Sequence, residues 1–417
     1  MHHFQYRDNE MFCEDVPIAK IAKEVGTPFY IYSHATLTRH FSAFDNAFNE
    51  VSHLVCFSAK ANSNLAVLNL FATLGSGLDI VSGGELYRGL MAGIPPERIV
   101  YSGVGKRIDE IEYALKSNIL MFNIESFQEL ETVNRCAERL NTRARIALRV
   151  NPDVDPKTHP YIATGMKKNK FGINKETAVS TYKAAQKLSN IDIVGIDCHV
   201  GSQLTETAPF VDALRKVKGL IADLEELGIH IQYLDLGGGL GITYDEEVPP
   251  HPDDYARAIV QELGKVPFTL IFEPGRVIVG NAGVLITECL YVKKSEKKKF
   301  VIVDAAMNDL ARPSLYDAYH AIQPATQGKR PPFVADVVGP ICESGDFFAR
   351  DRKLPEFKQG DLLALMSAGA YGFTMSSNYN SRPRVAEVMV KGDQFHVVRE
   401  RETYANLIQG ESLPTFL

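Results

Sequence analysis

The stretch HLVCFSAKANSNLAVLNLFATLGSGLDIVS, residues 53–82, contains the structural unit that the chain repeats. Its first apolar run, at 53–59, predicts a strand that ends just before Lys60. The run at 65–75 is apolar and closes with Gly75, which is typical of a helix end. A second apolar run at 77–82 predicts the next strand. Strand, helix and strand in this order indicate a parallel crossover unit.

The same alternation continues to about residue 280. Most of the short apolar runs are nearly continuous in Val, Ile and Leu, as expected of strands buried on both faces. Eight strands are predicted, at 53–59, 77–82, 98–103, 120–126, 145–151, 193–201, 233–239 and 269–275.

Helical patterns fill the intervals between these runs. Two of them open with a capping box, in which a serine is followed three residues later by glutamate: Ser82 with Glu85, and Ser126 with Glu129. Another precedes the first strand, at 37–51. It sets five apolar side chains at helical spacing: Leu37, Phe41, Phe44, Phe48 and Val51.

Eight strands that alternate with helices predict an α/β fold, a (β/α)8 barrel over residues 34–278. A doubly wound open sheet is the alternative, but the run LGGG near the seventh strand comes too late for a dinucleotide-binding fingerprint. After residue 280 helical patterns become sparse. The segment 283–306 predicts two strands around a charged turn, and further short strands follow. We therefore expect a mostly β domain of residues 1–33 plus 279–417, in which a strand at 27–33 either joins the β sheet or bridges to it.

Composition excludes several functional classes. The 417 residues are 45% hydrophobic and 23% charged, with a net charge of −6, which favours neither nucleic acid nor a membrane surface as a partner. No window reaches the roughly 18 apolar residues of a membrane span, and the first residues lack the apolar core of a signal peptide. The six cysteines form no Cys-x-x-Cys pair, so we expect no metal site, no disulfide framework and a cytoplasmic location. They are Cys13, Cys56, Cys136, Cys198, Cys289 and Cys342.

Polar residues or glycines follow most of the predicted strands. In a (β/α)8 barrel the chemistry lies at the carboxyl ends of the strands, so these residues are expected to converge on one rim. Lysine is rarely buried unless it is paired, so Lys60 either emerges into water or is held for chemistry. The residues at these ends are Lys60, Asp79, Ser82, Arg149, Asn151, His199, Ser202, Gly237, Gly238, Gly239, Glu273 and Arg276.

The chemistry of these groups suits a phosphorylated aldehyde cofactor. The segment 234–242, LDLGGGLGI, offers backbone N–H groups unshielded by side chains, a setting for a phosphate. Ser202 and Arg276 add donors for the same anion. A partly desolvated lysine such as Lys60 is a nucleophile toward a carbonyl.

A carboxylate and an aromatic ring complete this hypothesis. Glu273 is suited to keep a ring nitrogen protonated, and His199 is suited to stack on an aromatic ring. Together these residues predict a pyridoxal 5'-phosphate site with Lys60 as the lysine that binds the aldehyde. A phosphate-binding barrel with a reactive lysine and no cofactor, such as an aldolase, is the alternative. Asp79 is interpreted either as a site contact or as a structural hydrogen-bonding group, and Arg149 either as a site contact or as part of a salt bridge.

Nine motifs extend the pattern over nearly the whole chain. They are FSAKAN (57–62), GLDIVSGGEL (77–86), HPYIATGMKKNKFGI (159–173), HVGSQ (199–203), LDLGGGLGI (234–242), EPGR (273–276), DAAMNDLARPSLYDAYH (304–320), GPICESGD (339–346) and AYGFTMSSNYNSRPRVAEV (370–388). With these motifs the chain resembles the diaminopimelate decarboxylases, in the alanine-racemase-like, fold type III class of pyridoxal phosphate enzymes. The resemblance implies decarboxylation of meso-2,6-diaminopimelate to L-lysine and CO2, the last step of lysine biosynthesis.

The resemblance also implies a role for each site residue. Lys60 would bind the cofactor covalently, Glu273 would pair with its ring nitrogen and His199 would stack on its ring. Cys342 would donate a proton to the substrate, and Glu343 would bind its distal ammonium group. The remaining cofactor contacts would be Asp79, Ser202, Gly238, Gly239, Gly275, Arg276 and Tyr371, and the remaining substrate contacts Arg276, Arg312, Tyr316 and Tyr371.

In relatives the segment around Cys342 comes from the partner subunit, so a homodimer with shared active sites is implied. Arg276 and Arg312 suit a substrate with a second carboxylate, which favours diaminopimelate over ornithine, arginine or carboxynorspermidine. Carboxynorspermidine, or another basic amino acid, remains the alternative substrate. A racemase on the same barrel and a non-enzymatic relative are two further hypotheses. Glu273 argues against the racemase, and the presence of both Lys60 and Cys342 argues against the non-enzymatic relative.

Overall fold

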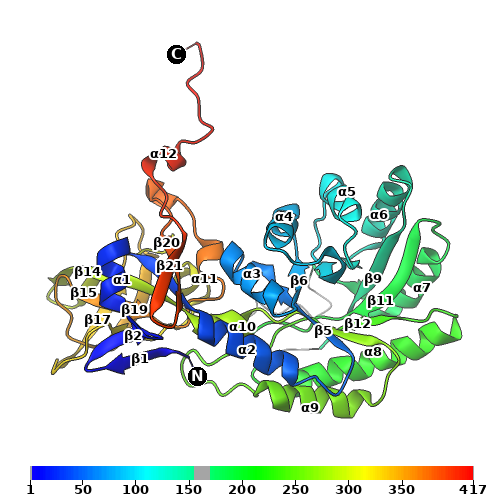
Figure 1. Ribbon diagram of the computed structural model, residues 1–417, viewed down its shortest axis with the longest axis horizontal. Coiled ribbons are helices and arrows are strands. Elements are labelled where there is room, and N and C mark those ends of the chain that lie inside the picture. The colour runs from blue at the N-terminus through cyan, green and yellow to red at the C-terminus, as the bar shows by residue number, and fades with distance from the viewer. Residues whose placement is uncertain (1, 155–169, 417) are drawn as a thin grey trace. The chain divides into compact units, whose positions relative to one another are not determined.

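The computed structural model describes residues 2–154 and 170–416, which form two compact units (Figure 1). One unit is Thr38–Ile278. The other combines the residues up to Leu37 with those from Val279 onward. The sequence analysis placed the divisions between 33 and 34 and between 278 and 279. Within the described ranges, no helix has the length and apolar character needed to cross a membrane.

The first unit is a closed barrel of eight parallel strands. Each strand pairs with the next around the ring, and β9 also pairs with β8. The last strand closes on the first, with Leu270 opposite His53. This closure confirms the predicted barrel and its eight strands, and it excludes the open sheet. The strands are β5 (His53–Ser58), β6 (Gly77–Ile80), β7 (Ile99–Tyr101), β8 (Met121–Ile124), β9 (Ala144–Asn151), β11 (Ile191–Asp197), β12 (Tyr233–Asp235) and β13 (Thr269–Phe272), with β10 (Ile173–Asn174) added alongside β9.

Helices α3 to α9 occupy the intervals between the barrel strands, as the sequence pattern predicted, while α2 precedes the first strand and α10 follows the last. From α3 to α6 each helix contacts the next around the outside of the barrel (Figure 1). Ser82 and Ser126 accept hydrogen bonds from the backbone N–H groups of Glu85 and Glu129, both at 3.2 Å, as expected of N-caps. The helices are α2 (His34–Asn46), α3 (Leu65–Thr73), α4 (Gly83–Met91), α5 (Ile108–Lys116), α6 (Phe127–Arg139), α7 (Lys175–Ala185), α8 (Ala208–Glu226), α9 (Pro252–Leu263) and the short α10 (Arg276–Val279).

The helix before the first barrel strand differs from its predicted bounds. Helix α2 begins at His34 and ends at Asn46, so Phe48 and Val51 lie in the turn after it. Four of the five predicted apolar side chains are buried, but Val51 is only half-buried. The ring of Phe48 packs 3.9 Å from that of Phe272, so the turn contributes to the same apolar layer as the helix.

The second unit is built around a sheet that joins the two ends of the chain. Its strand order is β18-β17-β15-β14-β4-β20-β21. Strand β4 (Phe29–Ser33) lies between β14 and β20, which settles that the predicted strand at 27–33 joins the β domain. The other strands are β14 (Gly283–Lys294), β15 (Lys299–Val303), β17 (Pro332–Val338), β18 (Phe347–Pro355), β20 (Ala386–Lys391) and β21 (Gln394–Arg399). In addition, β19 (Leu362–Leu365) pairs with β14, and β16 (Ile322–Pro324) pairs with β19.

Smaller elements complete this unit. Strands β1 (Phe4–Arg7), β2 (Glu10–Cys13) and β3 (Val16–Pro17) form a separate three-stranded sheet, followed by α1 (Ile18–Val25). An apolar core joins these first elements to the central sheet. Phe4, Met11 and Ile21 pack in one cluster with Phe29 and Val284. Helices α11 (Arg312–Tyr316) and α12 (Tyr404–Leu407) are single short turns.

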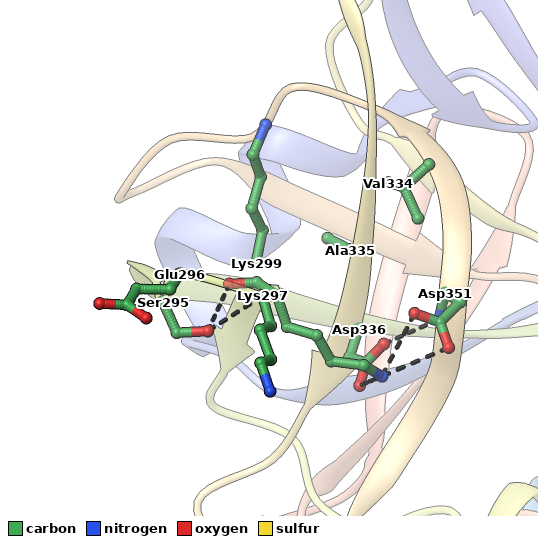
Figure 2. Close-up of a pocket in the computed structure, with 9 residues that line it drawn as sticks. Ser295, Glu296, Lys297, Lys299, Val334, Ala335, Asp336 and Asp351 are labelled. Carbon is green, nitrogen blue, oxygen red and sulfur yellow. Dashed lines mark hydrogen bonds and ion pairs between the residues drawn. The ribbon is translucent and has the colours of Figure 1, made fainter.

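The charged turn predicted between β14 and β15 is largely exposed, as a solvated hairpin should be. Lys298 reaches across to the neighbouring strands, and its Nζ lies 2.8 Å from Asp336 Oδ2 and 3.2 Å from Asp351 Oδ1 (Figure 2). A shallow pocket beside the turn is lined by this ion-paired group and by Lys297 and Lys299. The ion pairs therefore tie the hairpin to β17 and β18.

Candidate active site

Lys60 lies at the mouth of the barrel, two residues beyond β5. The strand ends at Ser58, one residue earlier than predicted, and Lys60 sits in the 3-10 turn η1 (Ala59–Ala61). Its Nζ forms an ion pair with the carboxylate of Asp79 on β6, whose side chain is completely buried. The Ser58 hydroxyl lies 2.8 Å from the same carboxylate oxygen. The lysine is therefore held by a buried charge, while its own side chain remains 34% exposed.

Glu273 follows directly after β13 and is buried beside this pair. Its Oε1 accepts hydrogen bonds from Ser102 Oγ at 3.2 Å and from Asn123 Nδ2 at 3.4 Å. Burial raises the pKa of Glu273 to about 7; the negative charge of Asp79 adds to this rise, and the ammonium group of Lys60 opposes it. The Ser58 hydroxyl contacts both the Asp79 carboxylate and the Glu273 carbonyl oxygen, so Lys60 and Glu273 belong to one hydrogen-bonded network.

The glycine turn after β12 packs closely against two other strand ends. Gly239 has a φ of +118°, and a Cβ there would come within 2.3 Å of the Gly201 carbonyl oxygen. A Cβ on Gly238 would come within 2.1 Å of the Glu273 carbonyl oxygen. The backbone of the turn therefore approaches its neighbours in a way that only glycine permits, and a surface of bare backbone remains. Gly275 is also closely packed, because a Cβ added there would come within 2.9 Å of Ala61 Cβ.

His199 contacts this turn as a neutral ring. Its Nδ1 accepts a hydrogen bond from the Gly238 N–H group at 3.2 Å, which places the ring proton on Nε2. Burial, together with the positive charges of Arg149 and Lys60, holds the pKa of His199 well below its usual value. A neutral imidazole is suited to pack against an aromatic ring.

Arg276 and Ser202 lie together, as the sequence analysis expected of two donors to one anion. Arg276 Nη2 donates to Ser202 Oγ at 3.2 Å, and Arg276 Nη1 donates to the hydroxyl of Tyr244 at 2.7 Å. The arginine is buried, with 6% of its surface exposed. Tyr244 was not predicted, because it lies in a loop without a distinctive pattern.

A second buried network lies around Arg149. Arg149 Nη1 donates to Glu125 Oε1 at 2.8 Å, and Arg149 Nε lies 3.9 Å from Asp197 Oδ2. This is the salt bridge that was one of the two interpretations of Arg149. Sequence reasoning missed the acidic partners, as it missed Ser58, Ser102, Asn123 and Asp235. The available signal was their position, since each lies at or just after the carboxyl end of a barrel strand.

The donor set of the barrel fits pyridoxal 5'-phosphate. Lys60 supplies an amine, Glu273 a buried carboxylate for a ring nitrogen, and the glycine turn a backbone surface next to Arg276. In the part of the chain that the structure describes, Asp79 Oδ1 is buried without a hydrogen-bond partner, so the carboxylate retains accepting capacity inside the site. The residues present are therefore compatible with the predicted cofactor.

The other predicted site residues belong to the β-rich unit. Arg312 and Tyr316 open and close α11, and Arg312 Nη1 lies 2.9 Å from His320 Nε2. Tyr371 is half-buried, with a φ of +55°. Cys342 and Glu343 are exposed, and Glu343 accepts a hydrogen bond from the Tyr379 hydroxyl, which raises the pKa of that tyrosine.

The segment that carries Cys342 is held by backbone hydrogen bonds to one aspartate. Asp346 accepts from the N–H groups of Ile341 and Met307, both at 2.7 Å. The Cys342 N–H group donates to Asn380 Oδ1 at 3.1 Å. The thiol is thus presented on an anchored turn. Of the motif at 159–173, residues 159–169 lie outside the described residues.

Fold and site together define the class: a pyridoxal phosphate barrel with a lysine, a buried carboxylate and a glycine turn at the strand ends. Residues 34–280 match the family model "Pyridoxal-dependent decarboxylase, pyridoxal binding domain". The chain belongs to the diaminopimelate decarboxylases, which confirms the resemblance found in the sequence.

Three similar proteins support this placement. The diaminopimelate decarboxylase of Vibrio cholerae is 52% identical over 415 residues, and that of Pseudomonas aeruginosa is 53% identical over 413 residues; each alignment covers 99% of both chains. A crystal structure of the Helicobacter pylori diaminopimelate decarboxylase complexed with L-lysine superposes with a TM-score of 0.91 at 46% identity. It covers 94% of this chain and 98% of the other.

Proposed function

We propose that this chain removes one α-carboxyl group from meso-2,6-diaminopimelate to give L-lysine and CO2, the last step of lysine biosynthesis, with pyridoxal 5'-phosphate as cofactor. The observation that carries the proposal is 52% identity to a protein named diaminopimelate decarboxylase over 99% of this chain. The lysine in the Helicobacter pylori structure is the expected product, which supports the same reaction.

Bound pyridoxal phosphate supplies an electron sink for the pair of electrons left when CO2 departs. In this chain Lys60 would hold the aldehyde carbon of the cofactor, and its ion pair with Asp79 would orient the amine. Glu273 keeps the proton on the ring nitrogen, because its carboxylate is buried where no water competes for that hydrogen bond. His199 packs its neutral ring against the cofactor.

The glycine turn and its neighbours would hold the phosphate group of the cofactor. Gly238, Gly239 and Gly275 leave backbone uncovered by side chains, and Ser202 and Arg276 supply side-chain donors. The contact between Arg276 and Ser202 supports this role, since the two donors already lie 3.2 Å apart. Tyr371 completes the contacts to the cofactor and the substrate.

The predicted substrate groups are Arg276 of the barrel unit and Arg312, Tyr316, Cys342 and Glu343 of the β-rich unit. Arg276 and Arg312 bind the distal carboxylate, Tyr316 contacts the substrate beside them and Glu343 binds the distal ammonium group. Cys342 would donate the proton that the α-carbon takes up in place of CO2. Its exposure on an anchored turn supports this role, because the thiol is accessible while the backbone around it is fixed.

We place the enzyme in the cytoplasm as a homodimer, in which Cys342 of the partner subunit completes each site. All six cysteines are free, which supports a reducing compartment. The exposure of Cys342 and Glu343 supports a role for this turn at a subunit interface.

The test is CO2 release by purified, cofactor-loaded protein from a panel of amino acids. We expect turnover of meso-diaminopimelate and little or no turnover of ornithine, arginine or carboxynorspermidine, because these three compounds have no second carboxylate for the arginines to bind. Faster turnover of carboxynorspermidine would contradict the proposed substrate. Racemisation without CO2 release would contradict the proposed reaction.

A further inference from the structure

His320 ends the motif at 304–320, and the proposed reaction gives it no role. Its side chain is completely buried in the β-rich unit. The chain reverses after α11, where Asp317 adopts a left-handed conformation with a φ of +51°. This reversal brings the imidazole ring of His320 into contact with Arg312, eight residues earlier in the chain. The arginine that the resemblance assigns to the distal carboxylate therefore has a buried histidine as its neighbour.

The two ring nitrogens of His320 contact groups of opposite kind. Nδ1 lies 2.8 Å from the carbonyl oxygen of Met366, which can only accept a hydrogen bond. Nε2 lies 2.9 Å from Arg312 Nη1, which can only donate one. Nδ1 must therefore carry the ring proton, and Nε2 must offer its lone pair. The contacts thus define a neutral ring with a single tautomer, because a proton on Nε2 would face the N–H group of the arginine.

The backbone around this ring is anchored as well. Arg352 Nη1 donates to the His320 carbonyl oxygen at 3.1 Å, and the Met366 N–H group donates to the Ala321 carbonyl oxygen at 2.9 Å. Met366 therefore bonds to the ring through its carbonyl oxygen and to the following residue through its N–H group. The pairing of β16 with β19 begins directly beyond this point. The ring is consequently held at the end of a paired stretch of sheet.

A fixed acceptor of this kind constrains the side chain that it contacts. Arg312 is buried, with 6% of its surface exposed, and its guanidinium group is a rigid plane of N–H donors. A hydrogen bond to Nη1 limits the orientation of that plane, and recognition of a carboxylate through two parallel hydrogen bonds depends on the orientation. Because the imidazole is neutral, this contact orients the arginine without neutralising its positive charge.

We infer that His320 is a positioning residue, which orients the guanidinium group of Arg312 toward the carboxylate of an amino acid ligand by accepting a hydrogen bond on Nε2. The inference rests on the proposed function in that Arg312 is taken to bind the distal carboxylate. His320 acts on the ligand only through Arg312. Its loss should therefore weaken recognition of the carboxylate rather than binding in general.

The first test is NMR spectroscopy of the full-length protein with 15N-labelled histidine, which reports the ring nitrogen that carries the proton. The signals of His320 are those that disappear in His320→Gln. At neutral pH we expect a neutral ring with its proton on Nδ1. A proton on Nε2, or on both nitrogens, would overturn the inference.

The second test compares two ligands of the cofactor-loaded protein. L-lysine carries a carboxylate and 1,5-diaminopentane lacks it, so the dissociation constant of the diamine divided by that of lysine measures carboxylate recognition. His320→Leu removes the acceptor, and we expect this ratio to fall roughly tenfold, as for the loss of one hydrogen bond to a charged group. His320→Gln keeps an acceptor oxygen and should restore part of the ratio. His396→Leu, at an exposed position on β21, is the matched control and should keep the wild-type ratio.

A merely structural role for His320 would give a different result. It would weaken the binding of both ligands alike in His320→Leu and leave the ratio unchanged, which would overturn the inference. A ratio in His320→Gln no higher than in His320→Leu would also overturn it. If His320→Leu fails to fold, the NMR spectrum of the wild-type protein, assigned with His320→Gln, still decides the matter.

Failure of the proposed function has its own signature. Wild-type protein that prefers L-lysine to the diamine but releases no CO2 from meso-diaminopimelate would contradict the reaction and leave the inference standing. Wild-type protein that releases CO2, with a preference for L-lysine that His320→Leu does not reduce, would do the reverse. Wild-type protein without any preference for L-lysine would overturn both the role of Arg312 and the inference.

Discussion

Lys60 is the residue on which the proposed chemistry depends, because its side-chain amine would bind the cofactor. Its partner Asp79 is completely buried, so the lysine is held by a charge that water does not screen. Ser58 contacts the same carboxylate and also lies 2.9 Å from the Glu273 carbonyl oxygen. The positions of the Lys60 amine and of the Glu273 backbone are therefore linked through one hydroxyl group.

Replacing Lys60 tests its covalent role. Lys60→Ala should abolish the visible absorption band of lysine-bound cofactor, because the variant lacks the amine that forms the linkage. Visible spectra and mass spectrometry after borohydride reduction measure this directly. Lys187→Ala, at an exposed position after α7, is the control and should keep both signals. Retention of the band in the Lys60 variant would refute the assignment.

We propose that Cys342 acts at a later step, so its replacement should have a different effect. General acid catalysis is typically worth ~10²–10⁴-fold, so Cys342→Ala should lower kcat by about that factor while the cofactor stays bound. Ser344→Ala, an exposed neighbour in the same turn, should keep wild-type turnover. Steady-state CO2 release and the visible spectrum measure the two properties separately. Unchanged kcat in the cysteine variant would remove Cys342 from its role.

Among the structural elements, the glycine turn after β12 is the least tolerant of side chains. Gly238→Ala places a Cβ 2.1 Å from the Glu273 carbonyl oxygen, so the turn or β13 must shift. We expect weaker cofactor binding and a lower free energy of unfolding, by roughly 1–3 kcal/mol for an overpacked site. Cofactor titration and urea denaturation measure these effects.

The same substitution in a helix provides the control. Gly219 lies within α8, and a Cβ there would meet no atom within 4 Å. Gly219→Ala should raise the free energy of unfolding by roughly 0.5–1 kcal/mol, because glycine is a poor helix former, and it should leave cofactor binding unchanged. Similar effects of the two substitutions would contradict the close-packing argument.

Glu402 lies in the segment after β21 and anchors it through hydrogen bonds whose contribution to stability depends on pH. Glu402 accepts hydrogen bonds from Arg384 Nε at 2.6 Å and from Asn378 Nδ2 at 2.7 Å. Burial alone would raise the pKa of Glu402, but the hydrogen bonds from Arg384 outweigh it and hold the pKa at about 2.

A lowered pKa means that Glu402 stabilises the fold above its unfolded-state pKa, near 4.3, and loses this contribution as pH falls toward 2. Glu402→Gln should therefore reduce the stability lost between about pH 5 and pH 2. Denaturant unfolding across that range measures the difference. If the variant loses as much free energy of unfolding as the wild-type protein between about pH 5 and pH 2, the ion pair does not contribute to stability in this range.

Strands and helices were predictable because their signals are local. Each barrel strand is a short apolar run, and the caps at Ser82 and Ser126 follow a fixed spacing. Strand β18 was missed, because charged residues such as Arg350 and Lys353 make its sequence resemble a loop. The sheet β1–β3 was missed because its strands are only two to four residues long.

The site was predictable only where a residue type is unusual for its position. Lys60 and Glu273 could be found because a charge at the end of an apolar strand needs an explanation. Asn123 and Asp235 could not be assigned a role, since their importance arises from contacts between strands far apart in the sequence. Such contacts depend on the register of the closed barrel, which sequence periodicity does not specify.

For the whole molecule, the central proposal is a dimer with shared active sites. Mixing Lys60→Ala with Cys342→Ala protein should then restore activity that neither variant has, because a mixed dimer contains one site with both wild-type residues. After full subunit exchange at equal amounts, about a quarter of wild-type activity is expected. CO2 release before and after mixing measures the gain. Activity that stays at the sum of the two variants would show that each site is built within one subunit.

The position of β4 has a consequence for how the chain is made. Phe29 is paired with Ile286 on one side and with Ala386 on the other. During translation β4 leaves the ribosome before the barrel strands, and both of its partner strands leave it only after the last barrel strand has emerged. The barrel can therefore fold first, and a chain truncated before residue 386 would leave one edge of β4 open to aggregation.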